Sequence, residues 1–557
     1  MPIPPGTLRT LRRAGRAARR RLSRFGRSED GSIIVLSLFF FLILVMVGGV
    51  AVDVMRFEAE RARVQGALDR AVLAAASLQQ RLDPKTVVED VFAKAGSRGR
   101  LGPVEVERAL NRRRVAARAD LAVDTLFMRL VGVDSLEAAA MGQAEESKSD
   151  IEIVLVLDVS SSMFTNNRIG SLRTAAANFV QTVLQNDAEN RVSVAVVPFD
   201  ANVNLGPDLL DRYTVTHRHG VAGADCVDLP PSAFDAPDIP LALEMPQTGY
   251  FDIGWDWDPS RTVSDPSPVP APRYDGIYCR VQPANLVRLP SNDLATLQAQ
   301  VRALTPTRGT SITAGMKWGL ALLDPGTRPA FDRLIADGKM REHLRGRPYD
   351  YGREDTLKVI VLMTDGEHSS TPVLRDAFRS GPSPIFRAAD GRHSIFHSGQ
   401  VPTGKPYWVP HLPADNWQVR PWNGAAPAAT ETYDASAASW PNVARLNWNE
   451  VWSSAQMSWV ATHLYAKALG GDWTDHRSGF VGWTRVSEMD RTLRDSCAQA
   501  RGKGVVVYAI NLEAPRGAAM LQACASVPGN YIYTTSGELV GTFEAIAASI
   551  GALRLTE

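Results

Sequence analysis

The chain has 557 residues, with 61 Lys and Arg against 60 Asp and Glu, and 45% of its residues are hydrophobic. This composition is typical of a folded globular protein and excludes a largely disordered chain. The length predicts about three domains, or one large domain enlarged by insertions. The near-zero net charge argues against a general nucleic-acid binder.

The charge is distributed unevenly along the chain. The first 30 residues contain nine Arg against Glu29 and Asp30, a net charge of +7, which leaves a net charge of −6 for the remainder. A basic leader, residues 1–31, therefore precedes a mildly acidic body.

An apolar segment follows the leader. Ile33 to Val52 is a run of 20 residues with no charge and one hydroxyl group, that of Ser37. At 1.5 Å per residue such a helix is about 30 Å long, the thickness of a hydrocarbon core. The sequence predicts one transmembrane helix over residues 32–53, with the N-terminus in the cytoplasm because the arginines precede it. Everything after residue 53 is then extracytoplasmic.

The basic leader and the apolar run also allow two alternatives in which the N-terminal segment is cleaved. A cleavable secretory peptide has a shorter apolar run, typically about 7 to 15 residues, and ends in a small-x-small site. A type IV prepilin leader would be cut after Gly31, but it normally has Glu at the fifth mature position, where this chain has Leu36.

Four cysteines lie in the predicted extracytoplasmic part, where disulfides form. They are Cys226, Cys279, Cys497 and Cys524, and they allow three pairings. No Cys-x-x-Cys or Cys/His spacing suggests zinc. Local pairing is expected, Cys226 with Cys279 and Cys497 with Cys524.

Residues 54–148 are expected to form a helix followed by a small α+β module. Apolar residues recur at alternating steps of four and three, which predicts that the span continues as an amphipathic helix to Pro84. The helix packs on its own domain or, alternatively, forms a self-associating stalk. The periodic positions are Val64, Leu68, Ala71, Ala75 and Leu78.

The remainder of this module is predicted from short runs. Val104–Val106 and Val115–Ala119 resemble strands, and a helix is expected around Asp124–Leu130. The charged tract from Glu145 to Asp150 is interpreted as a linker.

Apolar strands then alternate with helices from residue 149 to the end. Runs this uniformly apolar are typical of a parallel sheet covered on both faces, so the expected fold is a doubly wound α/β domain. The strands are Ile151–Leu157, Val192–Val197, Leu357–Met363 and Val505–Ile510, and the helices include Leu172–Leu184 and Thr313–Leu323.

Two long stretches, at about 200–290 and 367–486, interrupt this alternation. Both leave from the carboxyl ends of strands, so they should gather at the edge of the sheet where ligands bind in open α/β folds. The second contains eight tryptophans from Trp408 to Trp473 and a ninth at Trp483. These form either a small core of their own or an exposed recognition surface.

Oxygen-bearing side chains follow the predicted strands. Asp158, Ser160 and Ser162 stand two apart after the first strand, and Asp365 follows Thr364 at the end of another. Thr310 lies at the start of a helix between them. Two carboxylates and three hydroxyls are hard donors suited to Mg²⁺, Mn²⁺ or Ca²⁺. Since few protein ligands need bind directly, a partner's Asp or Glu could replace one metal-bound water.

These three pieces resemble the metal-ion-dependent adhesion site of von Willebrand factor type A domains. The D-x-S-x-S motif is Asp158, Ser160 and Ser162, the threonine is Thr310, and the aspartate of T-D-G is Asp365. The resemblance implies a bound divalent cation, Mg²⁺ before Mn²⁺ or Ca²⁺, and a protein partner with an acidic side chain. Arg308 replaces a Gly often found there, which places a cation beside the metal. An empty or purely stabilising site is the alternative.

Both ends of the chain resemble TadG-like proteins of the Tad (Flp) pilus system. The resemblance implies a single-pass inner-membrane protein of a Gram-negative cell with a periplasmic type A domain, acting in pilus assembly, surface adhesion or biofilm formation. The matching segments are residues 30–32, 51–53, 65–71 and 74–76 near the span, and Cys497, residues 504–510, Cys524, residues 531–533 and 553–556 near the end.

Other candidate sites are weaker. His393 and His397 have no third metal ligand with sensible spacing, and Asp252, Asp256 and Asp258 are interpreted as an acidic loop rather than a calcium site. Glu367, His368 and Ser369 suggest hydrolytic chemistry only by their proximity in sequence.

We therefore expect a binding protein rather than an enzyme, with no nucleic-acid partner and no small-molecule substrate. The alternatives are a surface adhesin not needed for pilus assembly, a structural tether with an inert metal, and a metal-dependent hydrolase that uses Glu367 or His368 as base.

Overall fold

The computed structural model describes most of the chain as two compact units. The first ends at Ser147 and the second begins at Lys148. The arginines of the predicted leader lie outside the described residues. Those described are 30–77, 82–96, 98–108, 112–147, 150–185, 187, 190–254, 269–353, 355–424, 440 and 442–551.

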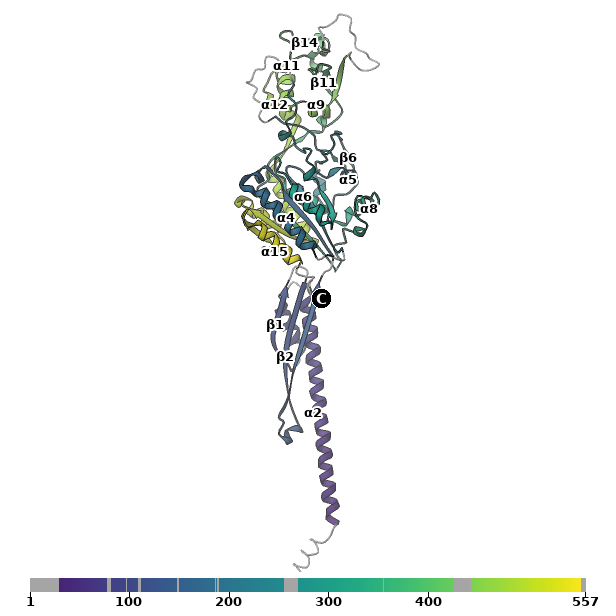
Figure 1. Cartoon of the computed structure of the whole chain (residues 1–557), viewed down its shortest axis with the longest axis vertical. Coiled ribbons are helices and arrows are strands. Elements are labelled where there is room, and N and C mark those ends of the chain that lie inside the picture. Colours follow the sequence, from purple (N-terminus) through teal and green to yellow (C-terminus); the bar gives the residue numbers. More distant parts are fainter. Residues whose placement is uncertain are drawn as a thin grey trace, which may run out of the picture. The chain divides into compact units, whose positions relative to one another are not determined.

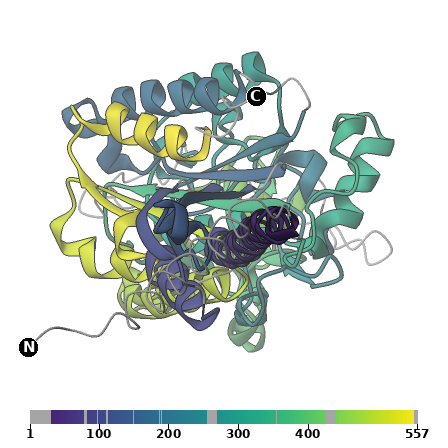
Figure 2. The same cartoon turned by 90° about the horizontal axis from the view of Figure 1, so that it is seen from below.

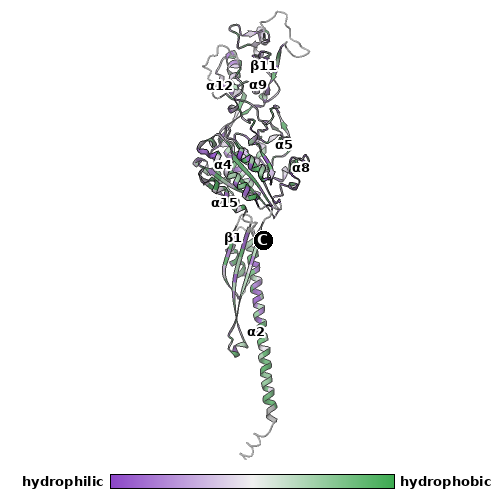
Figure 3. Cartoon of the chain, in the orientation of Figure 1, coloured by the Kyte–Doolittle hydropathy of each residue, from purple (hydrophilic) through white to green (hydrophobic). Residues whose placement is uncertain are grey.

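The first unit is organised on one continuous helix, α2 (Asp30–Ala76), of 47 residues. Its first half is apolar and its second half is polar on one side, as Figure 3 shows. In the part of the chain that the structure describes, it is the one helix long and apolar enough to cross a membrane. The predicted span from Ile33 to Val52 lies entirely within it.

The second half of α2 packs on an antiparallel sheet and a short helix (Figure 1). Val64, Leu68, Ala71 and Ala75 are fully buried there, so the amphipathic pattern reflects packing within this unit. Leu78 lies outside the described residues. The sheet has the order β1 (Arg100–Arg108), β2 (Arg112–Asp124), β3 (Ser135–Ser147), and the helix is α3 (Pro84–Lys94).

Two helix predictions in this unit are wrong. The helix α2 ends at Ala76, well before Pro84, which instead begins α3 behind the capping side chain of Asp83. The helix expected around Asp124–Leu130 is the end of β2 followed by a short 3-10 turn, η1 (Met128–Val131).

The tract interpreted as a linker is mostly strand. Glu145 and Glu146 belong to β3, where they pair with Arg114 and Arg113 of β2. Asp150 is the first residue of the next strand. Each glutamate lies opposite an arginine of the neighbouring strand, and a run of charged residues is equally typical of a linker in the sequence alone.

The second unit contains a six-stranded sheet with the order β18-β17-β9-β4-β5-β8. All neighbouring strands are parallel except β8, which runs antiparallel to β5. Leu155 at the centre pairs with Val196 on one side and Val361 on the other. The strands are β4 (Asp150–Asp158), β5 (Val192–Phe199), β8 (Arg288–Ser291), β9 (Thr356–Thr364), β17 (Val506–Leu512) and β18 (Tyr531–Thr534).

Both faces of this sheet are buried by helices. The helices α4 (Arg168–Leu184) and α15 (Leu539–Gly551) lie side by side (Figure 2), with Phe179 of α4 against Phe543 of α15. Val154 and Val156 share a core with α7 (Ile312–Ala321) and α13 (Val486–Gly502). The predicted doubly wound α/β fold is therefore confirmed.

Helix α7 approaches the sheet unusually closely because two of its residues are glycines. A Cβ atom at Gly315 would lie 2.5 Å from the Phe199 ring, and one at Gly319 would lie 2.6 Å from a methyl of Val156. This approach brings the start of α7 to the carboxyl edge of the sheet, where Thr310 precedes it.

The first insertion is held onto the domain by a buried lysine and is cross-linked within itself by a disulfide. The Nζ atom of Lys317 on α7 donates to the carbonyl groups of Ala236, Pro237 and Asp238. Burial lowers the pKa of Lys317 to about 8. The structure contains both predicted bridges, Cys226–Cys279 in this insertion and Cys497–Cys524 between α13 and α14 (Ala518–Cys524).

The second insertion has its own sheet and core. It leaves and returns through the paired strands β10 (Thr371–Leu374) and β16 (Val481–Thr484). Trp448, Trp452 and Trp459 are at most 6% exposed in its core, whereas Trp483 on β16 is 40% exposed. Its sheet has the order β14 (Trp417–Gln418), β13 (Tyr407–Trp408), β12 (His393–Phe396), β11 (Pro382–Ala388), β15 (Val443–Asn447), and its helices are α9 (Trp448–Ser454), α10 (Met457–Trp459), η10 (Val460–Ala466), α11 (Lys467–Leu469) and α12 (Trp473–Phe480).

The two insertions share one core, as expected if both start from the same edge of the sheet. Phe251, Ile253 and Tyr278 of the first insertion pack with the aromatic residues of the second. The Asp252 carboxylate accepts hydrogen bonds from the backbone of Gly254 and from Nε2 of Gln456 in the second insertion. It therefore joins the insertions. Its two predicted companions, Asp256 and Asp258, lie outside the described residues.

A group of buried charges lies at the opposite, amino-terminal end of the strands. Glu152 on β4 is 3% exposed and pairs with Lys358 on β9 and, at 3.7 Å, with Arg347. Arg347 also contacts Asp150 at 3.4 Å. Burial lowers the pKa of Lys358, which shows that its charge depends on this partner.

Candidate metal site at the carboxyl edge of the sheet

Carboxylates stand at the carboxyl ends of four adjacent parallel strands. Asp158 ends β4, Asp200 follows β5, Asp365 follows β9, and Glu513 follows β17. The carboxyl ends of parallel strands meet at one edge of a sheet, so residues far apart in sequence gather there.

Asp158 is completely buried at the centre of this edge. One carboxylate oxygen accepts a hydrogen bond of 2.7 Å from the backbone N–H of Ser160, and the other accepts one of 2.5 Å from the hydroxyl of Thr364. These bonds fix the carboxylate between the first loop and the end of β9.

The two serines connect Asp158 to the second carboxylate. The hydroxyl oxygens of Ser160 and Ser162 are 2.9 Å apart, and the Ser162 hydroxyl donates to Asp365 at 2.6 Å. Four of the five residues predicted from the sequence are therefore linked by one chain of hydrogen bonds. The oxygens in this chain are all of the hard type that Mg²⁺ and Mn²⁺ prefer.

Thr310, the fifth residue, is 7% exposed and is attached to the segment after Asp365. Its backbone N–H donates to the Ser369 hydroxyl at 2.8 Å, and its carbonyl accepts from the Ser369 N–H at 3.0 Å. Gly309 before it has a φ of +81°, and a Cβ there would lie 2.6 Å from that of Ala201. Only glycine fits this turn.

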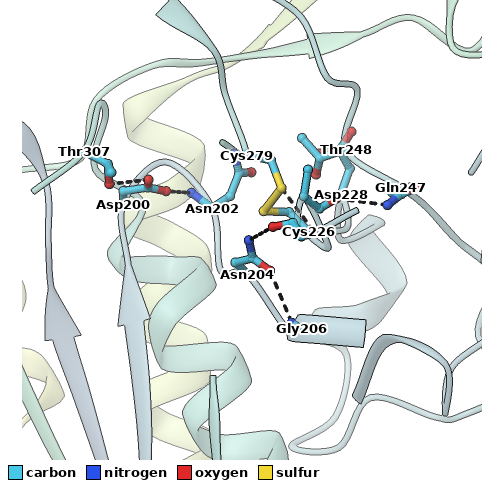
Figure 4. Close-up of a disulfide and its surroundings, with 12 residues drawn as sticks. Asp200, Asn202, Asn204, Gly206, Cys226, Asp228, Gln247, Thr248, Cys279 and Thr307 are labelled. Atoms are coloured by element: carbon cyan, nitrogen blue, oxygen red, sulfur yellow. Dashed lines mark hydrogen bonds between the residues drawn. A yellow bond between two sulfur atoms is a disulfide. The ribbon is translucent and has the colours of Figure 1, made fainter. Parts of the chain in front are cut away.

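Asp200 holds the Thr310 loop from the other side. Its carboxylate accepts a 2.5 Å hydrogen bond from the Thr307 hydroxyl, and its carbonyl accepts one of 2.6 Å from the N–H of Ser311. Figure 4 shows Asp200 between Thr307 and Asn202, beside the Cys226–Cys279 disulfide. Asp200 is thus a positioning residue that the sequence analysis missed.

The electrostatics of the site favour a bound cation. Burial, together with the nearby charge of Asp365, raises the pKa of Asp158 to about 7. Burial also raises the pKa of Asp200 to about 6. The charge of Asp365 disfavours ionisation of the buried Asp158, and a divalent ion bound by both carboxylates would offset that penalty.

The cation next to Asp365 is Arg168 rather than Arg308. The Arg168 guanidinium donates to Asp365 at 2.8 Å and to Glu513 at 3.1 Å, with its side chain 14% exposed. The pKa of Asp275 is lowered mainly by its hydrogen bond from Arg273, and the side-chain charge of Arg308 adds a smaller effect in the same direction. Glu513 could have been found from the sequence, since it too follows an apolar strand.

His368 has a structural role that leaves it no free nitrogen. Its Nε2 atom accepts from the backbone N–H of Thr313 at 3.0 Å, so Nδ1 carries the proton and donates to Asp490 at 2.7 Å. The ring therefore ties the first turn of α7 to α13. Burial lowers its pKa, and Glu367 beside it is exposed.

The other metal candidates do not form clusters. Within the described residues, no group of three or more His, Cys, Asp or Glu is placed to hold a metal ion. The Nε2 atom of His397 donates to the carbonyl oxygen of Leu464 at 3.0 Å, and His393 packs against the ring of Trp459. Both histidines belong to the core of the second insertion.

A cleft of about 860 Å³ opens beside the site. The first insertion, the start of α7, the β10–β16 pair and α13 contribute to its walls, and Ala201 and Ser311 lie where it approaches the Thr310 loop. The exposed ring of Trp483 lines it. The cleft is wide enough for several side chains of a partner.

Comparisons with known proteins agree with the N-terminal resemblance. Residues 31–78 match the family model described as putative Flp pilus-assembly TadE/G-like. No curated protein matches the chain. The resemblance to TadG-like proteins is thus confirmed in the segment that carries the apolar helix.

Several solved structures are similar to this chain at low identity. The von Willebrand factor domain of the type V pili tip protein Mfa5 from Porphyromonas gingivalis is 14% identical, with a TM-score of 0.30, over 74% of this chain and 98% of that one. The pilus adhesin RrgA from Streptococcus pneumoniae is 13% identical, with a TM-score of 0.28, over 81% and 50%.

A third similar structure is a matrix protein of the mussel byssus. Proximal thread matrix protein 1 with a zinc-occupied metal-ion-dependent adhesion site is 11% identical, with a TM-score of 0.26, over 72% of this chain and 48% of that one. At TM-scores of this size, the fold assignment rests on the order and direction of the strands in the sheet.

Proposed function

We propose that this chain is a membrane-anchored component of Tad (Flp) pilus assembly whose second unit binds a protein partner through a divalent cation. The observation that carries the proposal is the hydrogen-bonded chain from Asp158 through Ser160 and Ser162 to Asp365, at the carboxyl edge of a doubly wound sheet. The match of residues 31–78 to a pilus-assembly family supports the cellular setting.

The residues that would hold the cation are Asp158, Ser160, Ser162, Thr310 and Asp365. A bound Mg²⁺ would supply a coordination position for an acidic side chain of the partner, and Mn²⁺ can replace Mg²⁺ in binding experiments. Asp200 and Ser369 position the Thr310 loop, and the cleft beside Ser311 would receive the partner's neighbouring residues.

The helix α2 would anchor the protein in the inner membrane. Its apolar half is long enough for one crossing, and the arginines before it favour a cytoplasmic N-terminus. The second unit would then lie in the periplasm, a compartment that permits the two disulfides. Adhesion and biofilm formation would follow from its action on pili.

The experiment that tests this function compares two chromosomal variants in the same loop. Asp158→Ala is expected to abolish piliation and surface attachment at normal protein level, whereas Ser161→Ala, which changes an exposed neighbour, should leave both intact. Pili are counted by electron microscopy, and attachment is measured on a surface. Normal pili with lost attachment would favour the adhesin alternative, and normal values of both would favour an inert tether.

The Arg168 guanidinium should weaken cation binding. Arg168→Gln is expected to raise the affinity for Mn²⁺ about tenfold, or ~1.4 kcal/mol, the size expected for one screened charge close to a divalent ion. Arg308→Gln is the matched control and should change the affinity little. Isothermal titration with Mn²⁺ measures both, and equal affinities for wild type and Arg168→Gln would contradict the role given to Arg168.

A further inference from the structure

A loop at the tip of the β2–β3 hairpin exposes large apolar side chains. Leu126 is 59% exposed, Leu130 is 79% exposed and Val131 is 51% exposed. All three lie in or next to η1, within the ten residues that join the two strands. Three such side chains on one short loop are unusual for a surface facing water.

The loop is fastened to α2 by a buried aspartate. Asp53 is 2% exposed, and its carboxylate accepts hydrogen bonds from the backbone N–H groups of Leu126 at 2.9 Å, Phe127 at 2.7 Å and Met128 at 2.8 Å. Three bonds to one charged group fix the loop against this point of the helix.

A second contact lies one helical turn deeper. A Cβ atom at Gly49 would be 2.4 Å from the ring of Phe127, so the absence of a side chain at Gly49 is what admits the ring. Gly49 belongs to the apolar run that ends at Val52. The loop therefore lies beside the last turn of the segment that would cross the membrane.

From this placement we infer that the η1 loop, residues 125–133, inserts Leu126, Leu130 and Val131 among the lipid acyl chains of the leaflet in which α2 completes its crossing. The inference rests on the membrane anchoring proposed above. Lipid is the occupant that fits, because the exposed loop is continuous with the exposed apolar surface of α2, where Val45 and Val52 are each 44% exposed.

The polar groups around the loop suit the boundary between hydrocarbon and water. Arg129 pairs with Asp134 at 3.1 Å, and both side chains are more than 70% exposed. Arg56, one turn after Asp53, lies 3.6 Å from the Asp53 carboxylate. Arginines at this depth can extend their charged ends to the headgroups while their stems stay in apolar surroundings. The loop would then set how deep α2 sits in the bilayer and which way the sheet faces.

The test places a photoreactive diazirine amino acid at single positions of the full-length protein in vesicles of phosphatidylethanolamine and phosphatidylglycerol. Position 130 reports on the loop. Position 45 reports on the span itself, and position 73 is the control, because Leu73 is 65% exposed on the same helix but lies about 30 Å beyond Val52 at 1.5 Å per residue. Mass spectrometry after irradiation identifies the adducts.

Lipid adducts at positions 130 and 45, with none at position 73, are the expected result. Adducts at 45 but none at 130, or a protein adduct at 130, would overturn the loop's insertion while the membrane anchor stands. No lipid adduct at 45 would overturn the anchor itself. Because Leu130 is exposed and the bonds to Asp53 come from the backbone, the substitution at 130 leaves the attachment of the loop in place.

Discussion

Asp158→Ala is expected to abolish the stabilisation that Mg²⁺ or Mn²⁺ gives to the second unit. A ligand that binds only the folded state stabilises it by about 2.7 kcal/mol at 100 times its dissociation constant. Asp158 is completely buried and is joined to Ser160 and, through the serines, to Asp365, so its loss disconnects the donor set. Thermal unfolding with saturating Mn²⁺ and with EDTA measures the effect as a difference in Tm.

The control for this experiment is Ser161→Ala, which should retain the full shift with Mn²⁺. A wild-type protein whose Tm is the same in Mn²⁺ and in EDTA would contradict metal binding. A shift that survives in Asp158→Ala would place the ion elsewhere.

The same carboxyl group predicts a dependence on pH without metal. Its folded-state pKa is raised from 3.8 to about 7, so the folded protein holds this proton more tightly than the unfolded chain. The resulting stability is fully present below pH 3.8 and is lost as the pH rises through 7. In EDTA, Asp158→Asn should remove this part of the pH dependence, and denaturant unfolding at several pH values measures it.

The second large effect is expected at the other end of the strands. Glu152→Ala should destabilise the second unit by about 3 to 5 kcal/mol, the usual cost of removing one partner from a buried ion pair. The substitution leaves Lys358, which is 5% exposed, with the carbonyl of Leu323 as its remaining close acceptor. Urea unfolding of Glu152→Ala and of the wild type gives the difference in the free energy of unfolding.

An exposed pair supplies the matched comparison. Lys405→Ala breaks the salt bridge between Lys405 and Asp415, whose side chains are 44% and 67% exposed, respectively. The substitution should lower the free energy of unfolding by about 0 to 1 kcal/mol. The double change Glu152→Leu with Lys358→Met should recover much of the loss, because neither charge is then left buried alone. A Glu152→Ala protein as stable as the wild type would show that the buried charges contribute nothing.

The central sheet was predictable because its strands are apolar on both faces. Ile151–Leu157 and Leu357–Met363 are apolar except for Glu152 and Lys358, and a parallel sheet covered by helices is the arrangement that buries such strands. The residues Asp158 and Asp365 were then found by reading the first polar positions after each run. Their linkage through Ser160 and Ser162 follows from the parallel direction of β4 and β9.

What the sequence could not give depends on tertiary packing. Arg168 lies in a helix and shows no sign of its contact with Asp365 until α4 is placed on the sheet. The turn after Asp124 has apolar residues at helical spacing, but its N–H groups bind Asp53 on α2, a contact between distant residues that the spacing does not show. Glu152 and Lys358 interrupt apolar strands, and only the register of β4 and β9 makes them partners.

The tryptophans illustrate the same limit. A run of aromatic residues predicts either a core or a recognition surface, and in this insertion three of the tryptophans belong to a core. Trp452 and Trp459 are at most 1% exposed, whereas Trp483 borders the cleft beside the site. The exposure of Trp483 follows from the pairing of β10 with β16, which the spacing of the tryptophans along the chain does not predict.

The most direct measurement is to locate a bound Mn²⁺ ion in the second unit by anomalous diffraction from crystals of the full-length protein. An anomalous peak bounded by the oxygens of Asp158, Ser160, Ser162, Thr310 and Asp365 is the predicted result. A crystal grown with saturating Mn²⁺ that has no peak there, with Arg168 still bound to Asp365, would contradict a cation-dependent binding site.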